Sequence, residues 1–151
     1  MMRSFHFLWT FSLLKRDMKM LLIEAYFELG FARILKLLPI SKTSNSLGAH
    51  MEETPYITRE SDEILLKKIS EAIHIMSRHT FWESQCMVKA LAGMRMLNKR
   101  RIACTIYFGT GRDQDGNMCA HAWLRSGSLY ISGAEEMNRF TIVGKFAKTV
   151  H

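Results

Sequence analysis

The sequence is poor in three features that mark particular protein classes: cysteine, proline and long apolar runs. Its 151 residues include three cysteines and two prolines. Three cysteines without close spacing argue against a disulfide framework and favour a reducing compartment. The opening apolar stretch is too short for a transmembrane helix, and it lacks the charge order and cleavage site of a signal peptide. We therefore expect a cytoplasmic protein, and we leave open a peripheral membrane contact of the N-terminal segment.

Negative charge is missing from a long segment in the second half of the chain. No Asp or Glu occurs between Ser84 and Arg112, where the basic residues are Lys89, Arg95, Lys99, Arg100, Arg101 and Arg112. The whole chain carries a formal net charge of +7. Such a surface is either a solvated face or a contact for an acidic peptide, a nucleic acid or a membrane. Because no helix-turn-helix, RNP or zinc-finger spacing occurs, we do not expect nucleic-acid binding.

The first part of the chain has the periodicity of helices. Residues 17–38 carry apolar side chains at helical spacing as far as Pro39, and the helix they predict is apolar enough to need a covering domain or partner. Residues 40–60 are rich in Ser, Thr, Asn and Gly, which is typical of a linker. Ser61 fits the N-cap of a second helix that reaches residues 77–79, with Asp62 and Glu63 in its first turn. Residues 85–98 predict a third helix.

The period then changes to that of strands. Residues 102–110 and 118–125 are β-type runs joined by a turn at Asp115 and Gly116, a strong hairpin signal. Residues 128–132 predict the next strand, and residues 139–146 predict the last one after a Gly-Ala-Glu-Glu loop. Helices followed by an antiparallel β-meander indicate an α+β domain. We expect this domain at residues 61–151, and a helical extension with its linker at residues 1–60.

Cys86 and His121 are the candidates for nucleophilic chemistry. Cys86 falls in the first turn of the third predicted helix, where free backbone N–H groups favour a thiolate. His121 falls in a strand of the sheet on which such a helix packs. A thiolate attacks a carbonyl, an imidazole takes and returns the proton, and the Cys86 N–H with the Gln85 amide could donate to the oxyanion. The alternative is that Cys86 is simply a buried small hydrophobic residue.

Alternation along this strand separates two faces. Residues 120, 122 and 124 are Ala or Leu and form an apolar face, which we expect to pack on the core. His121 lies on the opposite face with Cys119 and Trp123. A metal site that uses Cys119, His121 and another cysteine is the alternative, but C-x₂₋₄-C and H-x₃₋₅-H spacings are absent. We therefore expect no metal and no other cofactor.

Three segments together resemble one known family. Cys86 lies in WESQCMVKALAGMRMLNKRRIACTIYFGT, His121 lies in AHAWLR, and GAEEMNRFTIV follows. They are similar to the B2 proteins of lasso peptide biosynthesis, which are leader peptidases of the transglutaminase-like cysteine protease superfamily. The resemblance is close over residues 81–147, and the helical lead-in of these proteins is similar to KRDMKMLLIEAYFELGFARILKLLP.

The resemblance implies a transglutaminase- or papain-like core with the nucleophile at a helix N-terminus. It also implies that Cys86 is the nucleophile and His121 the general base of a cysteine endopeptidase. Such an enzyme removes the leader from a ribosomally made lasso precursor before an ATP-dependent cyclase closes the macrolactam ring. Because no second domain is evident, the resemblance implies the split form, which depends on a small PqqD-like recognition protein, B1, to present the leader.

The third catalytic position departs from the family pattern. The family commonly has an aspartate at the end of the strand after the histidine, where this chain has Ser132 and Gly133. Glu135 is the nearest carboxylate and is our candidate for the third member, because a carboxylate stabilises an imidazolium better than a hydroxyl does. Ser132 and the hairpin residues Asp113 and Asp115 are the alternatives.

Two other functions use the same residues or the same surface. A transglutaminase-like acyl transferase or amidase has the same Cys–His pair, with an amine in place of water as the second nucleophile. A non-catalytic adaptor holds an acidic peptide on the basic helix face instead. For the leader peptidase, Lys99 to Arg101 are candidates to contact acidic residues of the leader or a partner. Residues 17–38 are either a docking surface for the recognition protein or the cyclase, or a helix that packs on the catalytic domain.

Overall fold

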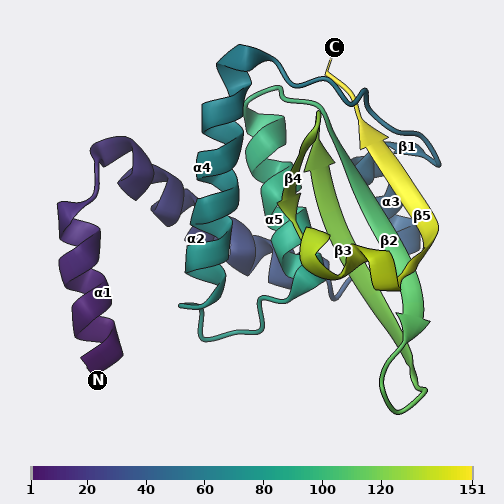
Figure 1. Ribbon diagram of the computed structural model, residues 1–151, viewed down its shortest axis with the longest axis horizontal. Helices are drawn as coiled ribbons and strands as arrows, with labels where there is room; N and C mark the ends of the chain where they lie inside the picture. Colours follow the sequence, from purple (N-terminus) through teal and green to yellow (C-terminus); the bar gives the residue numbers. More distant parts are fainter. Residues whose placement is uncertain (1, 151) are drawn as a thin grey trace.

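The computed structural model describes residues 2–150, with side chains from residue 6 onward. Its elements in chain order are α1 (Met2–Leu13), α2 (Arg16–Leu35), α3 (Ile40–Leu47), β1 (Ala49–His50), α4 (Glu60–Ser77), α5 (Cys86–Lys99), β2 (Cys104–Arg112), β3 (Met118–Ser126), β4 (Leu129–Ser132), η1 (Ala134–Arg139) and β5 (Thr141–Lys148). Helices α2, α4 and α5 lie on one side of the sheet (Figure 1). The predicted α+β class is therefore confirmed. None of the helices in the described residues is long and apolar enough to cross a membrane.

The sheet has the strand order β1-β5-β2-β3-β4, and every neighbouring pair is antiparallel. Strands β2, β3 and β4 form the predicted meander, and Gly116 and Gly127 adopt positive φ in its two turns. The prediction that the last strand continues this meander is wrong, because β5 pairs with β2 and not with β4. The expected Gly-Ala-Glu-Glu loop is the start of η1. This short helix crosses in front of the sheet and leads the chain from β4, at one edge, to β5 on the far side of β2 (Figure 1).

One hydrophobic core joins the helices to one face of the sheet. Side chains that are almost fully buried in it include Leu29, Ile69, Val88, Leu97, Ile106 and Leu124. The first of these belongs to α2, the next three to α4 and α5, and the last two to β2 and β3. The expected domain boundary at residue 60 does not coincide with a break in this core, because α2 buries one face against α4 and α5.

The segment 40–60 is more ordered than the linker that its composition predicts. It contains α3, in which Leu47 is buried, and β1, which pairs with β5. The hydroxyl groups of Thr43, Ser44 and Ser46 donate to backbone carbonyls three or four residues earlier, so these polar side chains are compatible with a helix. Helix α4 begins at Glu60 with Arg59 at its N-cap, so the prediction of Ser61 as N-cap is wrong by two residues.

The other face of the sheet is covered by residues 51–58, here called the strap, and by η1. The guanidinium of Arg125, which is fully buried on β3, holds the strap. It donates to Thr54 O at 2.8 Å, to Gly127 O at 2.6 Å and to the Tyr107 hydroxyl at 2.9 Å. The Tyr56 ring stacks on it at 3.5 Å. This one side chain therefore joins the strap to β2, β3 and the turn before β4.

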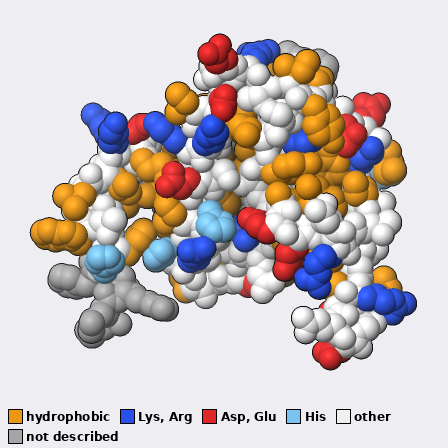
Figure 2. All heavy atoms as spheres, viewed as in Figure 1, with side chains coloured by type: hydrophobic (Ala, Val, Ile, Leu, Met, Phe, Trp, Pro, Cys, Tyr) orange, Lys and Arg blue, Asp and Glu red, His pale blue; other side chains and the backbone are white. Residues whose placement is uncertain are grey.

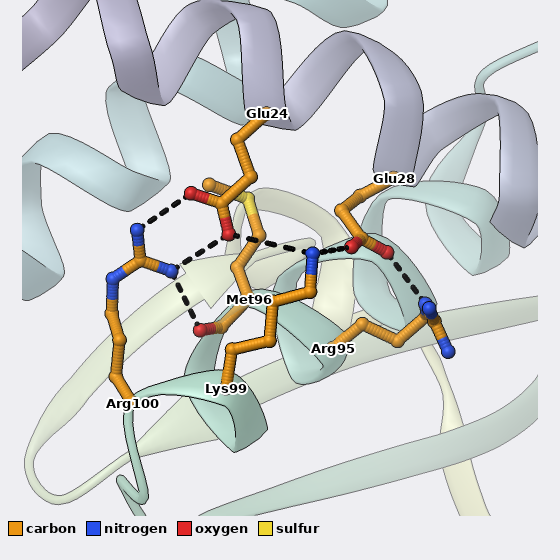
Figure 3. A network of polar contacts seen from close by, with 6 residues as sticks. All are labelled: Glu24, Glu28, Arg95, Met96, Lys99 and Arg100. Atoms are coloured by element: carbon orange, nitrogen blue, oxygen red, sulfur yellow. Dashed lines mark hydrogen bonds and ion pairs between the residues drawn. The ribbon is translucent and has the colours of Figure 1, made fainter.

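An ion network joins α2 to α5 (Figure 3). Glu28 on α2 is 4% exposed and accepts from Arg95 at 2.5 Å and from Lys99. The Glu24 carboxylate accepts two hydrogen bonds from the Arg100 guanidinium, at 2.8 and 2.6 Å, in a bidentate pair. Lys99 and Arg100, which the sequence analysis assigns to an acidic leader or partner, are thus already paired within the chain. Arg101 remains exposed.

We predict that Glu28→Gln lowers the free energy of unfolding by about 1–2 kcal/mol at pH 7, since it leaves two cations without their shared carboxylate. Burial opposes ionisation of Glu28, but hydrogen bonds from Lys99 and Arg95 outweigh it and lower the pKa of this carboxyl below 4.5. The folded-state pKa is the lower one, so this stabilisation is present above pH 4.5 and is lost as the pH falls through the folded pKa.

Urea unfolding of the wild type and of Glu28→Gln at pH 7 and at pH 3 measures this difference. The gap between them is expected to be smaller at the lower pH. Glu63→Gln is the matched control, because its partner Lys67 forms an exposed (i, i+4) pair worth about 0.3–0.5 kcal/mol. A gap that is equally large at both pH values contradicts the prediction.

Candidate active site

Cys86 is the first residue of α5, and the segment before it is fixed to α2. Thr80 Oγ1 bonds the Ser84 hydroxyl at 2.8 Å, and Glu83 pairs with Lys36 at 2.9 Å. The Trp82 ring lies so close to Gly30 that a Cβ there would be 3.3 Å from it. These contacts set where the helix begins. Cys86 is half-buried, and its position gives it the free N–H groups of the first helical turn.

His121 lies on β3 and faces away from the core, as strand alternation predicts. Ala122 and Leu124, its neighbours on the strand, face the core. The imidazole is half-buried between two aromatic rings, Phe140 at 4.8 Å and Trp123 at 5.8 Å between centroids, with interplanar angles of 23° and 26°. The two rings restrict the tilt of the imidazole.

A backbone carbonyl orients this imidazole. His121 Nε2 lies 2.7 Å from the carbonyl oxygen of Gly133. A carbonyl can only accept, so Nε2 carries the proton, and in the neutral ring Nδ1 is the unprotonated nitrogen. We expected a carboxylate, Glu135, in this orienting position, whereas the structure has a main-chain acceptor there.

Gly133 can hold this position because it has no side chain. Its φ is +79°, a left-handed conformation that favours glycine. A Cβ at this residue would lie 2.5 Å from the carbonyl oxygen of Ala122 and 2.8 Å from Trp123 Cβ. Both atoms belong to the rigid part of β3, so a substituted residue would have to move away from His121.

The structure brings Cys86 and His121 to the same end of β3 but onto opposite faces of the sheet. Helix α5 and β3 run in the same direction (Figure 1), and Gly93 of α5 lies against Leu124 of β3. Cys86 is two turns before Gly93 and His121 three residues before Leu124, which is about 10 Å in each case. Helix α5 packs on the core face, however, whereas the imidazole stacks on Trp123 on the other face of the sheet. Within the described residues, no hydrogen bond joins the Cys86 thiol to the imidazole.

The edge of β3 beside His121 is open. Strand β4 pairs with β3 only from Leu124 to Ser126, so within residues 2–150 the earlier part of β3 has no neighbouring strand on that side. Gly133 follows directly after β4 and approaches β3 at the carbonyl of Ala122. This open edge is the place where a bound peptide could contact both the α5 N-terminus and the imidazole.

The other predicted site residues lie apart from this contact. Gln85 is exposed at the N-cap of α5, and its side chain caps nothing. Glu135 is exposed in η1 and borders a small pocket of about 70 Å³ together with Gly133 and Lys89. Among the described side chains, it makes no hydrogen bond with His121. Asp113 accepts from the backbone of its own turn, and the buried Ser132 hydroxyl has no partner in the part of the chain described here.

The three cysteines are free, and they differ in access. Cys86 and Cys119 are half-buried, whereas Cys104 is buried. Burial raises the pKa of the Cys104 thiol to about 12. Within residues 2–150, no group of three or more His, Cys, Asp or Glu side chains converges in the manner of a metal site.

We predict that a thiol reagent at pH 8 modifies two cysteines in the native protein and three after unfolding, because a buried, protonated thiol does not react. Absorbance after addition of Ellman's reagent, with and without guanidinium, gives both counts. Cys104→Val should leave the native count at two and lower the unfolded count to two. Rapid native modification of Cys104 contradicts the assignment.

Sequence reasoning missed two groups of this site, Phe140 and the Gly133 carbonyl. A main-chain acceptor has no residue-type signature, because every residue carries a backbone carbonyl. The available signal was the glycine itself, which directly follows a short predicted strand.

Comparison with known proteins gives one match. A family model described as the transglutaminase-like superfamily covers residues 27–145, from within α2 to within β5. This span contains Cys86, His121 and Gly133. No curated protein and no solved structure matches the chain.

Proposed function

Because the chain belongs to the transglutaminase-like superfamily, which suggests cysteine-protease or acyl-transferase activity, we propose that it is a thiol peptidase with Cys86 as nucleophile and His121 as base. The observation that carries this proposal is the hydrogen bond between His121 Nε2 and the Gly133 carbonyl. It fixes the tautomer in which Nδ1 can accept a proton, which is what a general base requires.

The reaction has two halves. The Cys86 thiolate attacks the scissile carbonyl, and the N–H of Cys86 and the Gln85 amide stabilise the oxyanion. His121, having taken the thiol proton, returns it to the departing amine as the thioester forms. Water then gives a proton to His121 and attacks the thioester, and the thiol is restored as the carboxylate product leaves. Gly133 takes the orienting role that we had assigned to Glu135.

Reaction requires the thiol and the imidazole to meet, and we assign this step to substrate binding at the open edge of β3. An extended peptide can add to such an edge through main-chain hydrogen bonds. Catalytic hydrogen bonds are often long before the substrate binds and tighten in its complex. A pair that is not formed in advance fits an enzyme that works poorly without its recognition partner.

The substrate that we propose is the leader region of a lasso peptide precursor, cut at the leader–core junction. The PqqD-like recognition protein presents the leader, and the ATP-dependent cyclase takes the freed core. This assignment rests on the resemblance of residues 81–147 to the B2 leader peptidases, in which Cys86 and His121 match the positions of the nucleophile and the base.

We predict that Gly133→Ala lowers the cleavage rate by about 10²-fold, since displacement of a positioning group by 1 Å has effects of this size. Backbone strain should also destabilise the fold by about 1–2 kcal/mol. Rates at a fixed temperature and unfolding curves separate the two effects. Gly144→Ala is the control, because a Cβ there meets nothing within 4 Å. If Gly133→Ala cleaves at the wild-type rate, the Gly133 carbonyl does not orient His121 for catalysis.

Incubation with the precursor peptide and the recognition protein, followed by mass spectrometry, tests the proposal. A released leader with a free carboxylate, together with the intact core, supports the peptidase. A leader joined to an added amine indicates an acyl transferase instead. If neither product forms at any ratio of the two proteins, the peptidase proposal is wrong.

The second candidate is a peptide-binding adaptor, favoured by one observation: among the described residues, the thiol and imidazole are not joined. An adaptor should bind the precursor equally well after Cys86→Ala and give no product at all. The basic helix face is a poor site for this role, because Arg95, Lys99 and Arg100 are paired with Glu24 and Glu28 (Figure 3).

A further inference from the structure

Helix α2 has two apolar faces, and only one of them is buried. Leu22, Ala25 and Leu29 pack toward α4 and α5. On the opposite side lie five large apolar residues that are each 45–69% exposed: Met20, Ile23, Phe27, Phe31 and Ile34. At 100° per residue these five fall within an arc of about 80°. They are called the outer stripe below.

Helix α1 extends this apolar surface. An open groove of about 290 Å³ runs between α1 and α2, and it is lined by apolar side chains and Tyr26. Leu8 borders the groove together with Ile23 and Phe27, so it joins α1 to the outer stripe. Trp9 and Leu13 are exposed beside it. Figure 2 shows hydrophobic side chains along α1 at the left end of the molecule, and basic side chains near its junction with α2.

The charge around this surface is positive. Every acidic residue of α2 is ion-paired with a basic residue of α4 or of the end of α5. Lys15, Arg16 and Lys19, by contrast, have no carboxylate partner within 4 Å in the described residues. An apolar stripe with aromatic side chains and flanking unpaired cations is the pattern of a helix that lies in a membrane interface.

We propose that α1 and α2 bind the surface of an anionic lipid bilayer. The outer stripe and Trp9 enter the boundary between headgroups and acyl chains, while the basic side chains extend to the lipid phosphates. Helices α4 and α5 lie between the stripe and the sheet, so His121 and the open edge of β3 remain accessible from the aqueous side. The proposal does not depend on the peptidase activity.

Co-sedimentation of the full chain with vesicles tests this proposal. Vesicles of phosphatidylcholine with 30% phosphatidylglycerol are expected to bind at least tenfold more protein than vesicles of phosphatidylcholine alone. Trp9 emission should shift to the blue on binding, and Trp9→Phe removes this component from the signal of the other two tryptophans. Binding should weaken as salt is raised.

Variants locate the surface. Phe27→Ser is expected to weaken binding about tenfold through lost apolar burial. Arg16→Gln with Lys19→Gln should weaken it about 25-fold, at about fivefold for each cation. Ile57→Ser is the control, since this residue is highly exposed on the strap, and it should bind like the wild type.

Three results overturn the proposal. The first is equal binding to both kinds of vesicle, and the second is full binding by Phe27→Ser. The third is a dimer in light scattering that Phe27→Ser converts to a monomer without any vesicle binding by the wild type, because a second copy then covers the stripe.

Discussion

Cys86→Ala is expected to reduce leader release by at least about 10³-fold, and His121→Ala to reduce it by a similar factor, because nucleophile and base act as one unit. The double variant should be no worse than either single variant, for the same reason. The measurement is the initial rate of product formation by mass spectrometry, with precursor and recognition protein present. Thermal unfolding of each variant checks that the fold is retained.

Two controls belong to this experiment. Cys119→Ala removes a half-buried cysteine from the same face of β3 as His121, and His74→Ala removes an exposed histidine on α4. Both should keep the wild-type rate within about twofold. If Cys86→Ala retains cleavage while binding to the precursor is normal, the nucleophile is not Cys86 and the proposed mechanism fails.

Arg125→Leu is expected to lower the free energy of unfolding by about 3–4 kcal/mol, because removal of one partner leaves buried polar groups without hydrogen bonds. The groups left behind are the carbonyls of Thr54 and Gly127 and the Tyr107 hydroxyl. Burial and the contact with Glu53 already raise the pKa of Tyr107, so its hydroxyl remains protonated. Denaturant unfolding at pH 7 gives the value.

Arg125→Lys should cost less, about 2 kcal/mol, since an ammonium keeps the charge but cannot reproduce the planar set of donors. Arg139→Leu is the control, because its ion pair with Glu136 is exposed and worth less than about 1 kcal/mol. A loss below about 0.5 kcal/mol for Arg125→Leu would show that the strap is not held by this residue.

The sequence predicts local structure well where one periodicity governs a long segment. The helix predicted at 85–98 spans Cys86–Lys99, and the strands at 102–110 and 118–125 differ by at most two residues at each end. The segment 40–60 could not be predicted in this way. Its order depends on burial of Leu47 and on the pairing of β1 with β5, contacts with residues that lie about a hundred positions later in the chain.

For the site, alternation along β3 correctly predicts that His121 faces away from the apolar side. The same alternation implies that a helix on the apolar side lies across the strand from the imidazole, a consequence that was available from the sequence. The open edge of β3 depends on the short length of β4, and the Gly133 carbonyl is placed where the chain leaves β4 for η1. The length of β4 and the path of η1 depend on packing between residues far apart in the chain, and no local sequence motif predicts either of them.

The hydrogen bond from His121 to Gly133 has a consequence for how this site can vary among related proteins. An orienting carboxylate can be deleted by a single codon change, and its loss leaves a visible gap in a motif. A main-chain carbonyl is present whatever residue occupies the position, and a substitution removes it from the site only by altering the path of the chain. In a saturation mutagenesis scan, position 133 would therefore resemble an ordinary turn glycine, intolerant of side chains, and its chemical role would pass unnoticed.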